Sequence, residues 1–229
     1  MDFNRRHIIV TGGTGALGTA VVAALLDGGA HCRIPVFNDA EVEHFPHKDR
    51  VSFVPRCDLS NEADVARLYE GANDLWASVH IAGGFAMAPA ADTDKAALMR
   101  MLDMNLVSCH LCCRAALQAF GSRPGRIVNV AARPALEPRS GAGMVAYVAS
   151  KAAVAALTQA LAAEVASHRI LVNAVAPSII DTPANRAGMP KADHESWPKP
   201  AEIAATIAFL ASPQNQVTSG AIVPVYGRA

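Results

Sequence analysis

The sequence predicts an α/β fold: a doubly wound, parallel sheet of seven strands with helices on both faces. Short runs rich in β-branched residues alternate with alanine-rich helical stretches along the chain. These runs are apolar throughout instead of alternating between apolar and polar residues. Strands that are buried on both faces have this pattern, which is typical of a parallel sheet covered by helices. Right-handed crossovers between such strands produce the doubly wound arrangement.

The expected elements follow one another in a regular order. A strand and turn are expected at 7–13, a helix ending at two glycines at 16–29, strands at 31–37 and 51–58, a helix at 61–71 and a strand at 75–83. The second half is expected to contain a helix at 94–120, a strand at 125–132, a helix at 145–168, a strand at 169–177, a helix at 201–212 and a strand at 220–227. Because no repeat, linker or low-complexity segment divides the chain, residues 1–229 are expected to form one domain. The irregular stretch 181–200 contains four prolines, and since long loops in compact domains are usually functional, we expect it to be a substrate lid.

The composition argues against several classes of function. Lys plus Arg and Asp plus Glu both number 20, so the chain has no electrostatic basis for binding nucleic acid or an anionic membrane. No secretory signal fits before the first strand, and no apolar run of about 18 residues lacks a charge or a breaker. The five cysteines are odd in number, and free thiols suit a reducing cytoplasm. Cys109, Cys112 and Cys113 crowd into one apolar helical run, where packing is favoured over a zinc or redox site, and no metal is expected.

The segment VTGGTGALG follows the first strand and opens the first helix. Its residues Gly13, Gly15 and Gly18 match G-x-G-x-x-G in the strand–turn–helix context that gives this motif its meaning. The glycines permit a tight turn and let the backbone approach a diphosphate, while the helix N-terminus adds free N–H groups and a positive dipole. The sequence therefore predicts a Rossmann-type domain that binds NAD or NADP.

The choice between NAD and NADP stays open. An acid at the end of the second strand accepts hydrogen bonds from the adenosine ribose, whereas an arginine there favours a 2′-phosphate. The position expected to be acidic is Val36; Asp39 is expected to lie beyond reach, and Arg33 points to a face that the sequence does not define.

Several segments, in this order, resemble the signature segments of the short-chain dehydrogenase/reductase family over essentially the whole chain: TGGTGALG, CDLSNEADV, HIAGG, MNLVS, YVASK and APSIIDTP. The resemblance implies an NAD(P)-dependent oxidoreductase of a small molecule, in which Asp58 meets the adenine and Thr182 touches the nicotinamide amide. It also implies a homodimer or homotetramer, formed by pairing long helices across a two-fold axis. The cofactor-binding residues that it implies are Gly12, Gly13, Thr14, Gly15, Leu17, Gly18, Asp58, Leu59, Ala82, Gly83, Pro177, Ile180 and Thr182.

Tyr147 and Lys151 are four residues apart, which places a phenol and an ammonium on one face of a helix. A free phenol has a pKa of about 10, and a neighbouring ammonium lowers it. By resemblance to the family, Tyr147 is the proton donor and Lys151 both tunes it and binds the nicotinamide ribose. Asn105 matches the family's active-site asparagine, which holds a water that links the lysine to solvent.

The family usually has a serine just after the strand that precedes this helix, but here that place reads Ala131–Ala132. Loss of one such donor costs on the order of 10²–10³ in rate when charge gathers on a single oxygen. A conjugated imine spreads the charge over a ring system, and two alanines are expected to leave a smooth, roomy site for a flat heterocycle. The competing donor is Ser140 in a glycine-rich loop, although a solvent-facing loop serine is the favoured interpretation of that residue.

A narrower resemblance, to dihydropteridine reductase and its bacterial relatives, is carried by GGTGALG, AGGF, the missing serine and DTPANRAGMPKADHESW. That subfamily lacks the serine and reduces quinonoid dihydropterins; the absent second-strand acid departs from it. The sequence thus predicts a reductase of a conjugated imine or carbonyl. One alternative is a carbonyl reductase or alcohol dehydrogenase, acting on a ketone or 3-oxoacyl substrate, with Ser140 or a backbone donor replacing the serine. Another is a nucleotide-sensing protein without turnover. Candidates for an apolar substrate pocket are Phe85, Met87, Met189 and Trp197.

Overall fold

The computed structural model describes residues 1–228, which contain a seven-stranded sheet in the order β3-β2-β1-β4-β5-β6-β7. The strands are β1 (His7–Thr11), β2 (His31–Pro35), β3 (Val51–Val54), β4 (Leu75–His80), β5 (Gly125–Val130), β6 (Ile170–Pro177) and β7 (Ile222–Val225). All six neighbouring pairs are parallel, so the predicted fold class is confirmed. From β1 the chain moves outward to β2 and β3 and then returns to β4 on the other side of β1. Such a reversal of strand order opens a crevice at the carboxyl ends of the strands.

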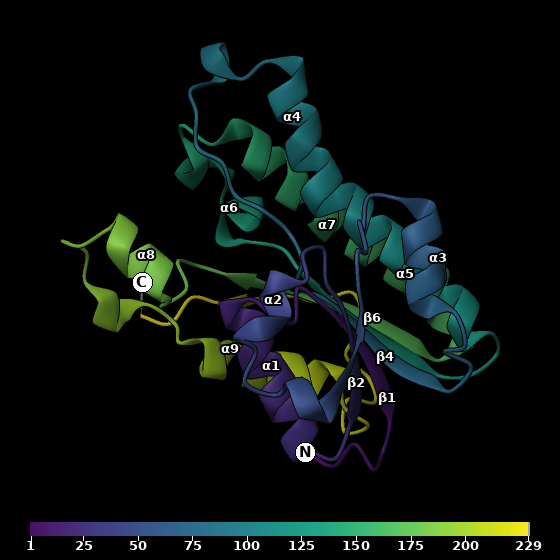
Figure 1. Cartoon of the computed structure of the whole chain (residues 1–229). Helices are drawn as coiled ribbons and strands as arrows, with labels where there is room; N and C mark the ends of the chain where they lie inside the picture. The colour runs from purple at the N-terminus through teal and green to yellow at the C-terminus, as the bar shows by residue number, and fades with distance from the viewer. Residues whose placement is uncertain (229) are drawn as a thin grey trace.

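Helices cover both faces of the sheet, and each face has its own apolar core (Figure 1). The longer helices are α1 (Ala16–Asp27), α3 (Glu62–Tyr69), α4 (Lys95–Leu102), α5 (Ser108–Phe120), α7 (Val145–Glu164) and α9 (Pro200–Ala211). Helices α1 and α9 pack together over one face through buried residues such as Leu25 and Ile207. Helices α3, α5 and α7 cover the other face and bury Leu68, Leu111 and Val154. Because both faces are covered, the central strands are apolar on both sides, as their sequences require.

The predicted helix at 94–120 is interrupted. Helix α4 passes into a π-helical turn, η3 (Asp103–Val107), before α5 begins. Such turns are frequent at functional sites, and this one carries the buried Asn105.

Short helices also form, and all but the one at 166–168, which lies within the helix expected at 145–168, occupy predicted loops. They are α2 (Ala40–Glu43), η1 (Lys48–Arg50), η2 (Ala90–Asp92), α6 (Arg133–Leu136), η4 (Pro138–Gly141), η5 (Ala166–His168), α8 (Pro183–Gly188) and η6 (His194–Ser196). The stretch 181–200 is therefore not irregular throughout, since it holds α8 and η6. Proline is compatible with the first turn of a helix, and it opens α6, η4 and α8.

Helix α7 has 20 residues and a hydropathy of 1.4, which by length and composition alone would let it cross a membrane. In the fold it lies against β6, and its buried face carries Ser150, Lys151 and Thr158. These polar side chains bond to neighbouring backbone and side-chain groups, which identifies α7 as a core helix of the domain.

Candidate active site

The glycine turn between β1 and α1 closes tightly against the end of β4. Gly12 has a φ of +65°, and a Cβ there would lie 2.7 Å from the backbone nitrogen of Ala82. A Cβ on Gly18 would collide with the carbonyl oxygen of Gly12. Gly15 is different, because a Cβ there would meet only that same oxygen at 3.4 Å, so its outer side is open. The first backbone N–H groups of α1 are consequently approachable by an anion, as the motif predicts.

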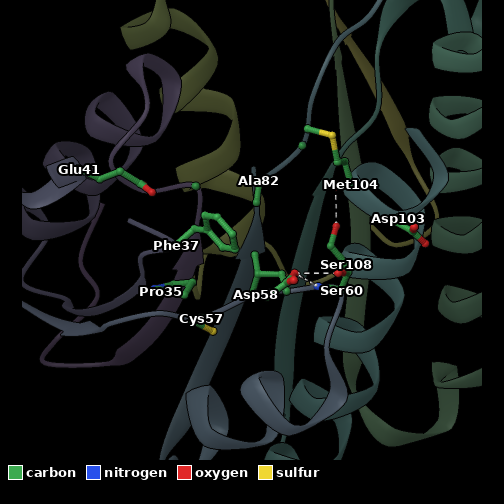
Figure 2. A pocket seen from close by; sticks show the side chains of 13 residues that line it. Pro35, Phe37, Glu41, Cys57, Asp58, Ser60, Ala82, Asp103, Met104 and Ser108 are labelled. Carbon is green, nitrogen blue, oxygen red and sulfur yellow. Dashed lines mark hydrogen bonds between the residues drawn. The ribbon is translucent and has the colours of Figure 1, made fainter. Parts of the chain in front are cut away.

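Two cavities lie along this turn and meet at Gly12, Glu41, Ala82 and Gly83. The larger, of about 560 Å³, is bounded by the glycine turn, the N-terminus of α1 and the ends of β4 and β5. The smaller, of about 220 Å³, lies beyond the ends of β2 and β3 (Figure 2). The first offers the free N–H groups that bind a diphosphate, and the second contains Asp58, the residue predicted to meet the adenine. The predicted cofactor residues that line one or both cavities are Gly12, Thr14, Gly15, Leu17, Gly18, Asp58, Leu59, Ala82, Gly83 and Ile180.

Three predicted cofactor residues line neither cavity. A Cβ on Gly13 would lie 2.9 Å from Ile34, so this glycine allows close packing of the turn on β2. Pro177 is buried at the end of β6. The Thr182 hydroxyl accepts a hydrogen bond from the Asn185 backbone at 3.2 Å and caps α8. For these residues a structural role is visible in the fold.

Asn105 fixes the segment that follows β4. Its Oδ1 accepts from the Gly84 backbone N–H at 2.9 Å, and its Nδ2 donates to the Gly84 carbonyl at 3.0 Å. The same Nδ2 also donates to Ser150 Oγ at 3.0 Å, and Ser150 donates to the Tyr147 carbonyl. The amide therefore ties Gly84, the neighbour of the wall residue Gly83, to the helix that carries Tyr147. Its predicted role as the holder of a water is not tested by these contacts.

Lys151 is buried and points at the sheet. Its Nζ donates to the Val130 carbonyl oxygen at 2.8 Å, and a Cβ on Gly83 would lie 3.4 Å from that Nζ. Val130 and Gly83 both line the larger cavity, so the ammonium lies just behind its wall. Burial lowers the pKa of the ammonium from 10.5 to about 8.

Tyr147 is partly buried, and its ring stands edge-to-face with Phe85 at a centroid distance of 5.0 Å. Burial raises the pKa of its phenol from 10.0 to about 12. Desolvation is the cause of this rise, since the ammonium of Lys151 is turned toward the Val130 carbonyl. The lowering of this pKa by Lys151 stays a prediction. Within residues 1–228 the phenol hydroxyl has no hydrogen-bond partner, which leaves it available to a substrate.

Ala131 and Ala132 directly follow β5 and are only 2% and 4% exposed. Ala131 packs with Ala155, Ala174 and Ala176, so the expected roomy surface at the two alanines is wrong: small side chains here let the layers approach closely. Neither alanine offers a donor other than its backbone N–H, and that of Ala131 is bonded to Val175.

Ser140 does not replace the missing hydroxyl. It is exposed in η4, and its Oγ donates to the Glu137 carbonyl at 2.8 Å. The favoured interpretation of Ser140 as a loop serine therefore agrees with the geometry.

The predicted substrate residues separate into two groups. Phe85 and Met87 are 62% and 66% exposed, and their segment is linked to the start of α7 by a bridge between Ala88 and Met144. Trp197, by contrast, is only 5% exposed and packs against His194 at 4.7 Å. Its assignment to an open pocket is wrong, because the stretch 181–200 folds with the indole turned inward. Met189 is 36% exposed but lines neither cavity.

The end of β2 explains why the sequence left the cofactor choice open. Val36 is buried, Arg33 donates to the Glu70 carbonyl, and Asp39 lies 3.9 Å from Arg56. None of these three residues lines either cavity, whereas Glu41 lines both. Sequence reasoning missed Glu41 because it lies on α2, a helix too short to leave a periodic pattern.

A buried polar cluster lies behind the site. The ligand atoms of His80, Cys109 and Cys113 are within 4.8 Å of one another, a grouping different from the Cys109–Cys112 pair considered from the sequence. However, the two His80 ring nitrogens already lie 2.8 Å from Ser78 Oγ and 2.8 Å from Asn129 Oδ1. The five cysteines are all free and buried. The arrangement therefore fits a satisfied polar network between β4, β5 and α5.

Comparisons with known proteins agree with this geometry. A sequence profile described as short chain dehydrogenase matches residues 6–192. Galactitol 2-dehydrogenase of Rhizobium johnstonii is 34% identical, over 95% of this chain and 92% of that protein. Cis-4-hydroxycyclohexanecarboxylate dehydrogenase of Sinomonas cyclohexanicum is 34% identical, over 98% and 96%. Among solved structures, gox2181 matches with a TM-score of 0.89 at 30% identity, covering 99% of this chain and 96% of that one. ElxO with NADP bound matches with a TM-score of 0.88 at 24% identity, covering 97% and 98%.

Proposed function

Since the chain belongs to the short-chain dehydrogenase family and is an NAD(P)-dependent oxidoreductase, we propose that it reduces a conjugated imine in a flat heterocycle, with quinonoid dihydropterin as the model substrate. The bound nicotinamide supplies the hydride for such a reduction. The chain must then hold the acceptor beside the cofactor and deliver one proton.

Tyr147 delivers the proton in this proposal. Burial raises its pKa to about 12, so the phenol is protonated throughout the neutral range and carries the proton that the substrate needs. Because a pKa this high makes the phenol a weak acid, the proton is delivered as negative charge develops on the substrate. Phe85 stands against the phenol and gives the substrate an aromatic wall. Lys151 lies behind the cavity wall formed by Val130 and Gly83, where it orients the nicotinamide end of the cofactor.

The observation that carries the proposal is that no second side-chain hydroxyl accompanies the Tyr147 hydroxyl among the described residues of the site. The alanines after β5 have no side-chain donor, and Ser140 is committed to the Glu137 carbonyl. Ser150, the nearest serine on α7, donates to the Tyr147 carbonyl and points into the interior. A substrate whose charge spreads over several ring atoms tolerates a single donor better than a ketone does.

A second candidate function is the oxidation of a secondary alcohol or the reduction of its ketone. It is favoured by the names of the relatives, which include galactitol and hydroxycyclohexanecarboxylate dehydrogenases. In that case Tyr147 acts as a base toward the alcohol, and its raised pKa opposes the reaction near neutral pH.

Steady-state oxidation of NADH or NADPH separates the two candidates. We expect kcat/KM for quinonoid dihydropterin to exceed that for cyclic ketones by at least about 100-fold, the effect of one missing donor. Ala132→Ser is the matched variant, and it should raise ketone reduction while leaving pterin reduction within about twofold. Ketone turnover equal to or above pterin turnover in the wild type would reject the proposal.

We further propose that the enzyme works in the cytoplasm, because its five thiols are free. We also propose that it assembles as a homodimer or homotetramer, for which α4 offers the partly exposed Leu98 and Met99. Nucleic acid and membrane have no place in this proposal, since the net charge is zero.

A further inference from the structure

The two cavities of the site are joined at one ionisable side chain. The cavity at the glycine turn and the cavity beyond β2 and β3 share Gly12, Glu41, Ala82 and Gly83. Of these four, only Glu41 carries a charge. A dinucleotide that places its diphosphate in the first cavity and its adenine in the second must place its adenosine ribose at this junction.

The Glu41 carboxylate is held in place although the residue is exposed. Thr14 Oγ1, in the glycine turn, donates to Glu41 Oε2 at 2.7 Å. The Asn38 backbone N–H donates to Oε1 at 3.0 Å. Figure 2 shows the side chain reaching from the α2 side toward Ala82. Each carboxylate oxygen can accept a second hydrogen bond, so the group retains capacity for ribose hydroxyls.

Among residues 1–228, no cationic side chain lines either cavity. The residues that line the two cavities include Asp58 and Asp103 besides Glu41, but no lysine or arginine. Arg56 is close to this end of the sheet, yet it lies 3.9 Å from Asp39. A 2′-phosphate at the junction would therefore meet negative charge, whereas a 2′-hydroxyl would meet an acceptor.

We propose that Glu41 supplies, from α2, the carboxylate that the end of β2 lacks, and that it makes the enzyme select NAD(H) over NADP(H). The proposal rests on the use of NAD(P) by the family and is independent of which substrate is reduced. Glu41 contacts the ribose of the cofactor and acts as a specificity residue, with Thr14 as the residue that positions it.

Equilibrium titrations followed by nucleotide fluorescence test this without any substrate. For the wild type we expect the Kd of NADH to be at least about tenfold lower than that of NADPH. Glu41→Gln keeps the size of the side chain and its capacity for hydrogen bonds but removes the charge. It should lower the Kd of NADPH and so remove most of the difference between the Kd values of the two nucleotides. Glu41→Arg should reverse the preference. Asp39→Asn is the matched control, because it removes an acid two residues away that lines neither cavity, and its ratio should stay within about twofold of the wild type.

Three results would overturn the proposal. The first is a wild type that binds NADPH as tightly as NADH, or that binds neither nucleotide. The second is a Glu41→Gln variant with the same ratio of Kd values as the wild type. The third is an Asp39→Asn variant that changes this ratio as much as Glu41→Gln does. Because binding is measured alone, a failure to reduce dihydropterins leaves this conclusion untouched, and the two proposals fail separately.

Discussion

Replacement of Asn105 by alanine should loosen the segment that joins the two cavities to α7, the helix that carries Tyr147. The side chain is 1% exposed and makes three hydrogen bonds, two to the Gly84 backbone and one to Ser150. At a net value of about 1 kcal/mol each, the free energy of unfolding should fall by about 3 kcal/mol. For a domain of this size that corresponds to a decrease in Tm of roughly 6–12 °C.

Thermal unfolding followed by circular dichroism measures this effect, and Ser150→Ala provides the comparison. That variant loses the bond to Asn105 and the bond to the Tyr147 carbonyl, but it leaves both Gly84 bonds intact. It should therefore cost about 1–2 kcal/mol. If Asn105→Ala is no less stable than Ser150→Ala, the amide does not hold the Gly84 segment and the reasoning is refuted.

Three further perturbations test other parts of the structure. Gly18→Ala should lower Tm, because the added Cβ collides with the backbone of the glycine turn. Gly15→Ala should leave Tm within about 1 °C of the wild type but weaken NADH binding in a fluorescence titration. Equal Tm values for the two variants would contradict this. Burial lowers the pKa of Lys151 to about 8, so between pH 8 and 10 the folded protein has lost a proton that the unfolded chain retains, and this group alone should add up to about 3 kcal/mol of stability as pH rises. Denaturant titrations of the wild type and Lys151→Met isolate this contribution from that of the buried thiols: the stability difference between the two proteins should shift by this amount in favour of the wild type, and parallel pH profiles would count against the assignment. Trp197→Ala should lower the free energy of unfolding by about 3–5 kcal/mol, because the indole is core and not pocket wall, and a stability within 1 kcal/mol of the wild type would disprove that placement.

The sheet and the glycine turn were predictable from the sequence because each follows from a strong local rule. Apolar runs separated by helices require a parallel sheet covered on both faces, and the strand–glycine–helix context requires an open helix N-terminus. The cavities accordingly contain most of the predicted cofactor residues, among them Gly15 and Asp58.

The remainder depends on contacts that a linear pattern does not carry. Glu41 lies on a helix of four residues, and only the folded chain brings it to Thr14. Trp197 was a candidate for the substrate pocket, but the stretch 181–200 folds with its indole turned inward. The spacing of Tyr147 and Lys151 correctly puts both on α7 but does not reveal that the ammonium bonds the Val130 carbonyl.

The central claim is that the Tyr147 hydroxyl, acting without a second side-chain hydroxyl, protonates the substrate. Single-turnover reduction of quinonoid dihydropterin by Tyr147→Phe, with NADH binding measured on the same preparation, tests it most directly. We predict a rate that is lower by about 10²–10⁴ while the Kd of NADH stays within about threefold of the wild type. A Tyr147→Phe enzyme that reduces the pterin at the wild-type rate would contradict the account.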